Sequence, residues 1–133
     1  MAQIPERFHD LFDVKTFGHF STVMPDGTPQ VTPVWVDYDE PANRVLVNTA
    51  RGRRKERNVR RNPKVGMSMT DPSDPYRFLS VRGEVTDLTE EGADAHIDAL
   101  AKRYMGADEY PNRDSEDGAR VVIRIRPDAV SHS

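Results

Sequence analysis

A dense group of cationic side chains lies between Arg51 and Lys64, in the segment RGRRKERNVRRNPK. The segment holds eight basic residues and one acid, so it carries a net charge of +7 within a chain whose net charge is −3. An acidic protein with one basic segment has a positive field concentrated in one place. Such a field attracts anions, and the segment therefore indicates a phosphate-bearing ligand, a nucleic acid or an acidic partner.

The middle of this segment is expected to form a helix over residues 53–62. Its residues favour helix, and Pro63 ends it because proline cannot continue a helical ladder. Val59 is the one apolar side chain, so it should face the rest of the protein, with Lys55 on the same face four residues earlier. Lys55 then carries its ammonium group toward the helix N-terminus, where free backbone N–H groups and the helix dipole attract anions.

A hydroxyl group is expected beside this lysine, because Thr49 ends the preceding strand. A hydroxyl, an inward lysine and a helix N-terminus together make a site suited to phosphate. Charge runs are also commonly solvated faces, and spacing alone leaves both interpretations open. On the outward side, Arg57, Arg60 and Arg61 are either solvated charge or a guide for an acidic part of the ligand.

Other kinds of chemistry have less support in the sequence. Nucleic-acid binding is disfavoured by a pI of about 5.8 and by the lack of aromatic residues among the arginines. The chain has no cysteine, and its histidines do not pair at ligand spacing, so no metal site is predicted. No nucleophile or acid–base motif is present, so no catalytic side chain is predicted and an enzyme of this kind would depend on a cofactor. Trp35, the single tryptophan, is either core packing or a platform edge against a flat ligand.

Alternation and turn signals predict the elements that position these residues. Strands are expected over residues 17–24, 30–38, 44–49, 64–70, 76–88 and 120–126, with helices over 6–12, over 53–62 and from Thr89 through a stripe that ends at Tyr104. Pro33 marks its strand as an edge or a bulge. The first three strands are joined by turns too short for parallel crossovers, so they should form an antiparallel meander. These elements predict a mainly β fold, an antiparallel β-barrel with α-helices around it.

The length of 133 residues indicates one domain, residues 1–133. Its hydrophobic content of 36% is somewhat low, which suggests that a second subunit shares apolar surface. No apolar run approaches the roughly 20 residues that a membrane helix needs, and the N-terminus has no signal-peptide pattern. The expectation is a cytoplasmic protein without a membrane segment.

Three ordered blocks of sequence, residues 25–37, 47–63 and 70–85, resemble the pyridoxamine 5′-phosphate oxidase-like split-barrel superfamily. Within it they are most similar to the branch of coenzyme F-420 (deazaflavin)-dependent oxidoreductases. The resemblance implies a six-stranded antiparallel split barrel of the FMN-binding type, which works as a homodimer with its cofactor sites at the interface. The segment after Pro127 lacks the Trp and Arg of true pyridoxamine phosphate oxidases, which disfavours vitamin B6 oxidation.

The same resemblance implies the residues of a cofactor site. Some of these residues would line the deazaflavin ring, some would lie at the end of the strand before the basic segment, and some would hold the phosphate. Others would support the basic helix or face the site from the other subunit. In chain order they are Gln30, Thr32, Pro33, Val34, Thr49, Ala50, Arg53, Arg54, Lys55, Asn58, Tyr76 and Arg77. The implied reaction is hydride transfer between reduced F-420 and an unsaturated small-molecule substrate. The alternatives are an FMN-binding oxidoreductase of the same type and a non-catalytic carrier of flavin or deazaflavin.

Overall fold

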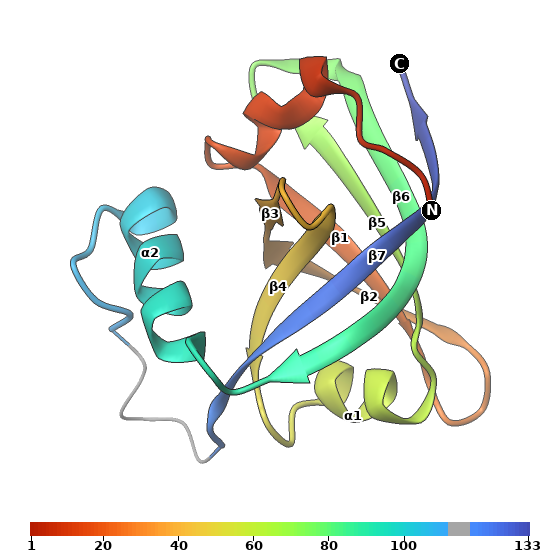
Figure 1. The fold of residues 1–133 in the computed structure, drawn as a ribbon, viewed down its shortest axis with the longest axis vertical. Helices are drawn as coiled ribbons and strands as arrows, with labels where there is room; N and C mark the ends of the chain where they lie inside the picture. The colour runs from red at the N-terminus through yellow and green to blue at the C-terminus, as the bar shows by residue number, and fades with distance from the viewer. Residues whose placement is uncertain (112–117) are drawn as a thin grey trace.

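A computed structural model describes residues 1–111 and 118–133 and has a mainly β fold (Figure 1). The described residues form seven strands, two α-helices and a 3₁₀ helix, η1. In chain order these elements are η1 (Glu6–Phe12), β1 (Phe17–Val23), β2 (Pro29–Trp35), β3 (Asp37–Asp39), β4 (Arg44–Ala50), α1 (Arg54–Arg61), β5 (Lys64–Asp71), β6 (Asp74–Thr89), α2 (Ala93–Met105) and β7 (Arg120–His132).

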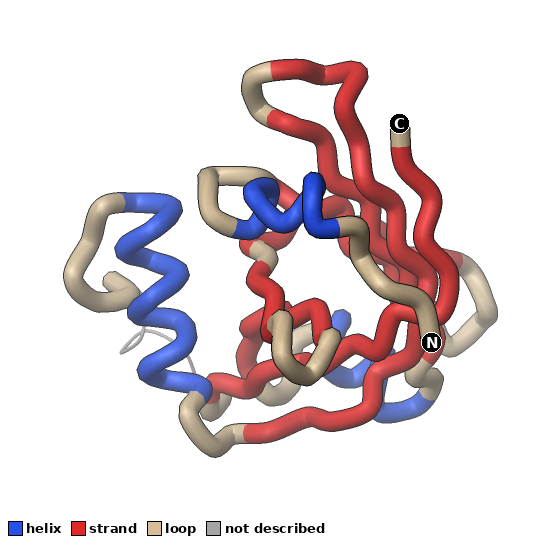
Figure 2. Tube along the Cα trace, turned by 45° about the horizontal axis from the view of Figure 1, so that its top comes forward, coloured by secondary structure: helices blue, strands red, loops and turns tan. Residues whose placement is uncertain are grey.

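All seven strands belong to one antiparallel sheet with the order β2-β1-β5-β6-β7-β4-β3. Strands β2 and β3 lie at its opposite edges, yet Val36 alone separates them in the chain. The sheet must therefore curl until its two edges come together at Val36, which produces a barrel (Figure 2). The predicted mainly β fold is confirmed, and the single strand expected over residues 30–38 is in fact two strands broken at Val36.

The barrel interior is filled by the inward half of each strand. In β1 the buried residues alternate with exposed ones, so Phe20 and Thr22 point inward while Phe17 and His19 point outward. This is the alternation expected of a strand with one solvated face. The 3₁₀ helix η1 adds Phe8 to the core and closes the barrel at the end opposite α1 (Figure 1).

Helix α2 lies against the outside of the barrel, over β4 and β7 (Figure 1). Its first residue, Ala93, packs with Leu46 and Val122 from these two strands. Asp37 at the start of β3 accepts hydrogen bonds from His96 Nε2 at 3.0 Å and from Arg103 Nη2 at 3.2 Å. These polar and apolar contacts hold α2 against the barrel, next to Val36, where β2 ends and β3 begins.

The structure corrects three expectations. The meander is wrong, because β4 pairs with β3 and β7, and the strand predicted to precede it, β2, pairs with β1. The helix expected to open at Thr89 begins at Ala93, since Thr89 ends β6 and Gly92 caps the helix with a φ of 75°. The last strand continues to His132 because β6 pairs with it far beyond residue 126.

Two further expectations concern particular stretches of the chain. Pro33 was expected at an edge or a bulge, and its strand, β2, is an edge of the sheet. The loop expected between Met105 and Gly118 lies partly outside the described residues, which omit 112–117. Among the described helices, none is long and apolar enough to cross a membrane.

Candidate functional site

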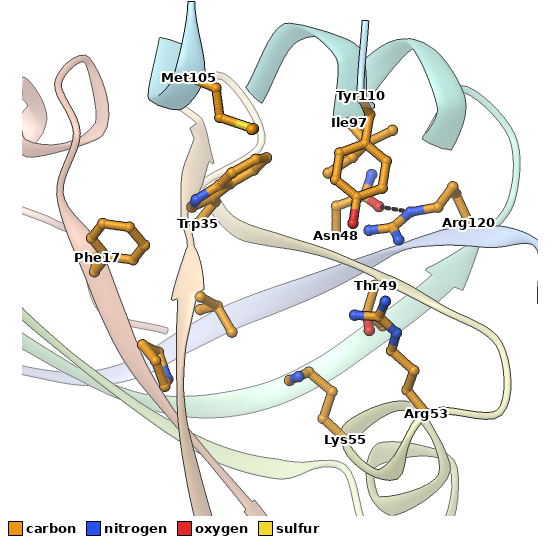
Figure 3. Close-up of a pocket in the computed structure, with 12 residues that line it drawn as sticks. Phe17, Trp35, Asn48, Thr49, Arg53, Lys55, Ile97, Met105, Tyr110 and Arg120 are labelled. Atoms are coloured by element: carbon orange, nitrogen blue, oxygen red, sulfur yellow. Dashed lines mark hydrogen bonds between the residues drawn. The ribbon is translucent and has the colours of Figure 1, made fainter. Parts of the chain in front are cut away.

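A pocket of about 300 Å³ opens where β2 and β4 diverge, between α1 and α2. Arg53 and Lys55 lie together at one side of it, Phe17, Trp35 and Met105 lie at the other, and Arg120 lies beside Tyr110 (Figure 3). The lining residues are Phe17, Pro33, Val34, Trp35, Asn48, Thr49, Arg53, Lys55, Ile97, Met105, Tyr110 and Arg120. None of these described lining residues is acidic, so the pocket suits a ligand with an anionic end and an apolar body.

Helix α1 places Lys55 in the pocket, with Val59 facing the protein as predicted. Val59 is 3% exposed and packs in the barrel core, which turns Lys55, one helical turn earlier, toward the pocket. Lys55 makes no hydrogen bond or ion pair with any residue of 1–111 or 118–133. Burial, reinforced by the nearby charges of Arg53 and Arg120, lowers the pKa of the Lys55 ammonium group. An anion placed beside it would relieve this electrostatic penalty.

The hydroxyl group of Thr49 is a second unsatisfied group in the pocket. Thr49 ends the inward run of β4 and is 1% exposed. Its Oγ1 is buried without a hydrogen-bond partner among the described residues. A buried hydroxyl without a partner costs about 1–3 kcal/mol. Thr49 and Lys55 are therefore two residues of the pocket wall whose polar groups have no partner among the described residues.

A buried carboxylate holds the loop that carries these cations. Glu56 is fully buried and accepts a hydrogen bond of 2.7 Å from the backbone N–H of Gly52. It also pairs with Arg60 Nε at 2.5 Å and with Arg51 Nη1 at 3.4 Å. A glutamate at the third helical position commonly reaches back to the N-terminal backbone in this way. This signal was available in the sequence, where Glu56 is the one acid of the basic segment, and it was missed.

The outward arginines are less available than expected. Arg60 is engaged by Glu56, and Arg61 donates hydrogen bonds to the backbone oxygen of Val23 and to Asn58 Oδ1. Arg57 is exposed. A guide for an acidic part of a ligand would therefore rest mainly on Arg57.

The twelve residues expected in a cofactor site fall into several places. Five of them line the pocket: Pro33, Val34, Thr49, Arg53 and Lys55. Gln30, Thr32, Ala50, Arg54 and Asn58 lie outside its lining.

Asn58 lies beneath α1, where it is fully buried and donates a hydrogen bond to Thr22 Oγ1 at 3.0 Å. The same threonine hydroxyl donates a hydrogen bond to Gln30 Oε1 at 3.4 Å. Gln30 and Asn58 thus belong to a hydrogen-bonded layer that joins α1 to β1 and β2. Thr32 is not part of this layer: like Thr49, it has a buried Oγ1 without a hydrogen-bond partner among the described residues.

Two expected residues lie on the β5–β6 hairpin and do not reach this pocket. Tyr76 is 87% exposed. Arg77 pairs with Asp10 at 2.7 Å and with Asp71 at 2.9 Å, which raises the pKa of its guanidinium. Arg77 therefore joins η1 to the hairpin, while Tyr76 is exposed to solvent.

Sequence reasoning missed the pocket residues contributed by β7 and α2. Arg120 Nε donates to Asn48 Oδ1 at 2.9 Å, and its guanidinium lies 4.9 Å from the centre of the Tyr110 ring (Figure 3). Arg120 reaches the pocket because it pairs opposite Ala50 in the β4–β7 ladder. Ile97 and Met105 come from α2. Their position depends on long-range pairing and helix docking, which local sequence patterns do not reveal.

The family described as pyridoxamine 5′-phosphate oxidase matches residues 4–133. A solved structure described as an F-420 reductase has 39% sequence identity and a TM-score of 0.82, and the match covers 96% of this chain and 98% of that chain. Comparison with curated proteins gave no match.

Two other solved structures resemble the chain in fold alone. A conserved hypothetical protein from Mycobacterium tuberculosis has 22% identity and a TM-score of 0.76, over 99% of this chain and 89% of that one. A putative pyridoxamine 5′-phosphate oxidase from Listeria innocua has 21% identity and a TM-score of 0.64, over 87% of this chain and 86% of that one. Together with the family match, these superpositions confirm the predicted split-barrel fold.

Replacing Thr49 by valine should change stability and binding in opposite directions. Valine has nearly the same shape and removes the unsatisfied hydroxyl, so the ligand-free protein should gain about 1 kcal/mol in its free energy of unfolding. The stabilisation that phosphate gives, measured by thermal unfolding with and without phosphate, should fall. Thr22→Val is the matched control, because the Thr22 hydroxyl is equally buried but hydrogen-bonded, and this variant should lose stability. A loss of stability in Thr49→Val would contradict the assignment.

Replacing Glu56 by glutamine should destabilise the protein by about 2–4 kcal/mol, since a buried charged acceptor is removed from its partners. The free energy of unfolding would be measured by urea denaturation. Glu84→Gln is the control, because Glu84 is partly exposed and meets Arg126 at 3.5 Å, so its loss should cost less than about 1 kcal/mol. Equal effects of the two substitutions would show that Glu56 does not anchor the loop.

Proposed function

Because the chain belongs to the pyridoxamine 5′-phosphate oxidase-like split-barrel family, we propose that it is an oxidoreductase whose pocket binds the deazaflavin coenzyme F-420. The proposed reaction is hydride transfer between reduced F-420 and an unsaturated small-molecule substrate. Its support from comparison is the 39% identity, over nearly the whole chain, to a structure described as an F-420 reductase.

The observation that carries the proposal is the environment of Lys55. A half-buried lysine without a partner among the described residues lies with the unsatisfied Thr49 hydroxyl in a pocket whose described lining has no acid. These donors fit a phosphate group, which accepts hydrogen bonds from ammonium and hydroxyl groups. The apolar side of the pocket, with Val34 and Trp35, fits a flat ring system.

Each part of the pocket has a proposed role in binding. Lys55 and Thr49 would hold the phosphate, with Arg53 beside them, and Val34 and Trp35 would contact the ring. The bound reduced cofactor supplies the hydride, so the chain's own residues bind, orient and keep water away from the reacting groups. Because FMN also carries one phosphate and a three-ring system, it remains the alternative cofactor for the same residues.

Titration of the purified protein with F-420 and with FMN, followed by fluorescence, tests the cofactor. We expect tighter binding of F-420, and clearly tighter binding of FMN would overturn this choice. Lys55→Ala should weaken F-420 binding by about 1.5–3 kcal/mol, the scale of a hydrogen bond to a charged group. Lys102→Ala is the matched control, because it removes the same side chain from an exposed position of α2 outside the pocket lining, and it should change the affinity far less.

The catalytic part of the proposal is separated from simple binding by turnover. Oxidation of reduced F-420 would be followed with a panel of enones, quinones and nitro compounds. Turnover with any member supports an oxidoreductase. Binding of F-420 without turnover on the whole panel would favour a non-catalytic carrier.

A second copy of the chain is the proposed partner. The outward face of β2, β1, β5, β6 and β7 carries one row of side chains without a carboxylate, lysine or arginine. This row consists of Pro33, His19, Ser68, Ser80 and Ser131. Val31 and Phe78, which are 59% and 39% exposed, lie on either side of it. In a chain with 31% charged residues, such a face suits a homodimer contact, from which Tyr76 would extend toward the other subunit.

Placing a charge in the middle of this face should separate the dimer. Ser68→Arg puts a long cation at an exposed strand position, so the monomer should still fold while sedimentation velocity reports half the mass of the wild type. Ala99→Arg is the control, because it adds the same charge at an exposed position of α2. A wild-type protein that sediments as a monomer at micromolar concentration would refute the dimer.

A further inference from the structure

The break between β2 and β3 creates an unusual need for hydrogen bonds. Trp35 pairs with Phe17 and Asp37 pairs with Leu46, but Val36 between them belongs to neither ladder. Its side chain is fully buried in the core, so its backbone is not freely solvated. Buried backbone N–H and C=O groups almost always find partners, and those of Val36 must come from outside the sheet.

Two consecutive residues of α2 supply these partners. The Val36 N–H donates to Tyr104 Oη at 3.1 Å, and Arg103 Nη1 donates to the Val36 oxygen at 3.1 Å. The Tyr104 hydroxyl in turn donates to the backbone oxygen of Thr16, just before β1. Burial raises the pKa of Tyr104, so the hydroxyl keeps the proton that it donates. The end of α2 thus takes the place of a strand at the break.

The ring of Tyr104 also packs against Trp35. The two rings stack with centroids 5.1 Å apart and planes 9° apart, while Phe17 meets the Tyr104 ring edge-on at 5.6 Å. Tyr110 meets Trp35 at 6.2 Å and 85°. Trp35 nevertheless lines the pocket with Met105 (Figure 3). Trp35 therefore packs against Tyr104 and also lines the pocket, while its contact with a flat ligand belongs to the proposed function.

We propose that Tyr104 is a positioning residue for this pocket: its hydroxyl fixes the strand break at Val36 and its ring fixes Trp35 against the ligand. The inference rests on the proposed function in taking a flat flavin-type ring as the ligand. Tyr104 itself is not among the pocket-lining residues, so its effect on binding is transmitted through Trp35. Because it holds the strand break by hydrogen bonds and the tryptophan by stacking, the two contributions can be separated by substitution.

Tyr104→Phe keeps the stacked ring and removes the hydrogen bonds of the hydroxyl to the backbones of Val36 and Thr16. Trp35 is the single tryptophan, so its indole N–H gives one signal in a ¹H–¹⁵N correlation spectrum. We expect this signal to move in the ligand-free Tyr104→Phe protein and F-420 to bind roughly fivefold more weakly, the effect of losing about one buried hydrogen bond. An indole signal at the wild-type position would overturn the proposal.

Tyr38→Phe is the matched control. Tyr38 also stacks on an aromatic ring, that of Phe12, and its hydroxyl donates to Asn43 at 2.7 Å, but it does not line the pocket. This variant should lose stability while leaving the indole signal and F-420 affinity unchanged. Equal weakening of F-420 binding in both variants would reduce Tyr104 to a general structural role and overturn the proposal.

The indole measurement is independent of the proposed cofactor. If neither F-420 nor FMN binds the wild-type protein, the proposed function fails, and the signal in ligand-free Tyr104→Phe still decides the positioning role. If Tyr104→Phe does not fold, Arg103→Met replaces it, because this change removes the donor to the Val36 oxygen from the other side of the break. It should move the same signal, and an unmoved signal would again overturn the proposal.

Discussion

Closure of the sheet at Val36 is the constraint from which the pocket arises. If β2 and β3 were one continuous strand, that strand would belong to a single edge of the sheet. β2 and β4 would then not diverge to leave an opening between them. The break instead sends the chain from one edge of the sheet to the other. It separates β2 from β4 at the point where α1 and α2 approach, so the cationic and aromatic walls come from elements far apart in sequence.

Charge is organised around a second constraint. Eight basic residues within 14 positions repel one another, and only Glu56 lies among them to offset this repulsion. Its burial concentrates that compensation on Arg51, Arg60 and the backbone of the loop. Lys55 receives none of it. The arrangement stabilises the loop and helix while leaving a desolvated cation in the pocket.

Short-range sequence patterns predicted many of the secondary-structure elements. The helix expected over residues 53–62 is present as Arg54–Arg61, with Val59 inward, because helix formers, a proline stop and one apolar residue are local signals. The break at Val36 was not predictable in this way. It depends on which strand each edge meets, and the sequence around it reads as one continuous strand.

The residues of the candidate site also divide into those that local sequence predicts and those that depend on contacts between distant segments. Thr49 and Lys55 are close in sequence and were both expected near the pocket, where they are found. Arg120 depends on the pairing of β7 with β4, and Trp35 depends on docking of α2. The resemblance to a known family supplied Pro33 and Val34, which residue types alone would not have selected. Contacts between distant segments therefore account for most of what sequence reasoning missed.

Under the proposed function, the unsatisfied hydroxyl of Thr49 would link the protein's persistence to its ligand. A ligand that binds only the folded chain stabilises it in proportion to the logarithm of the ratio of its concentration to its dissociation constant. The ligand-free form keeps the desolvation penalties of Thr49 and Lys55, so it would unfold more readily than the complex and be more open to proteolysis. A cell that runs short of the ligand would consequently hold less of this protein, without any change in its synthesis.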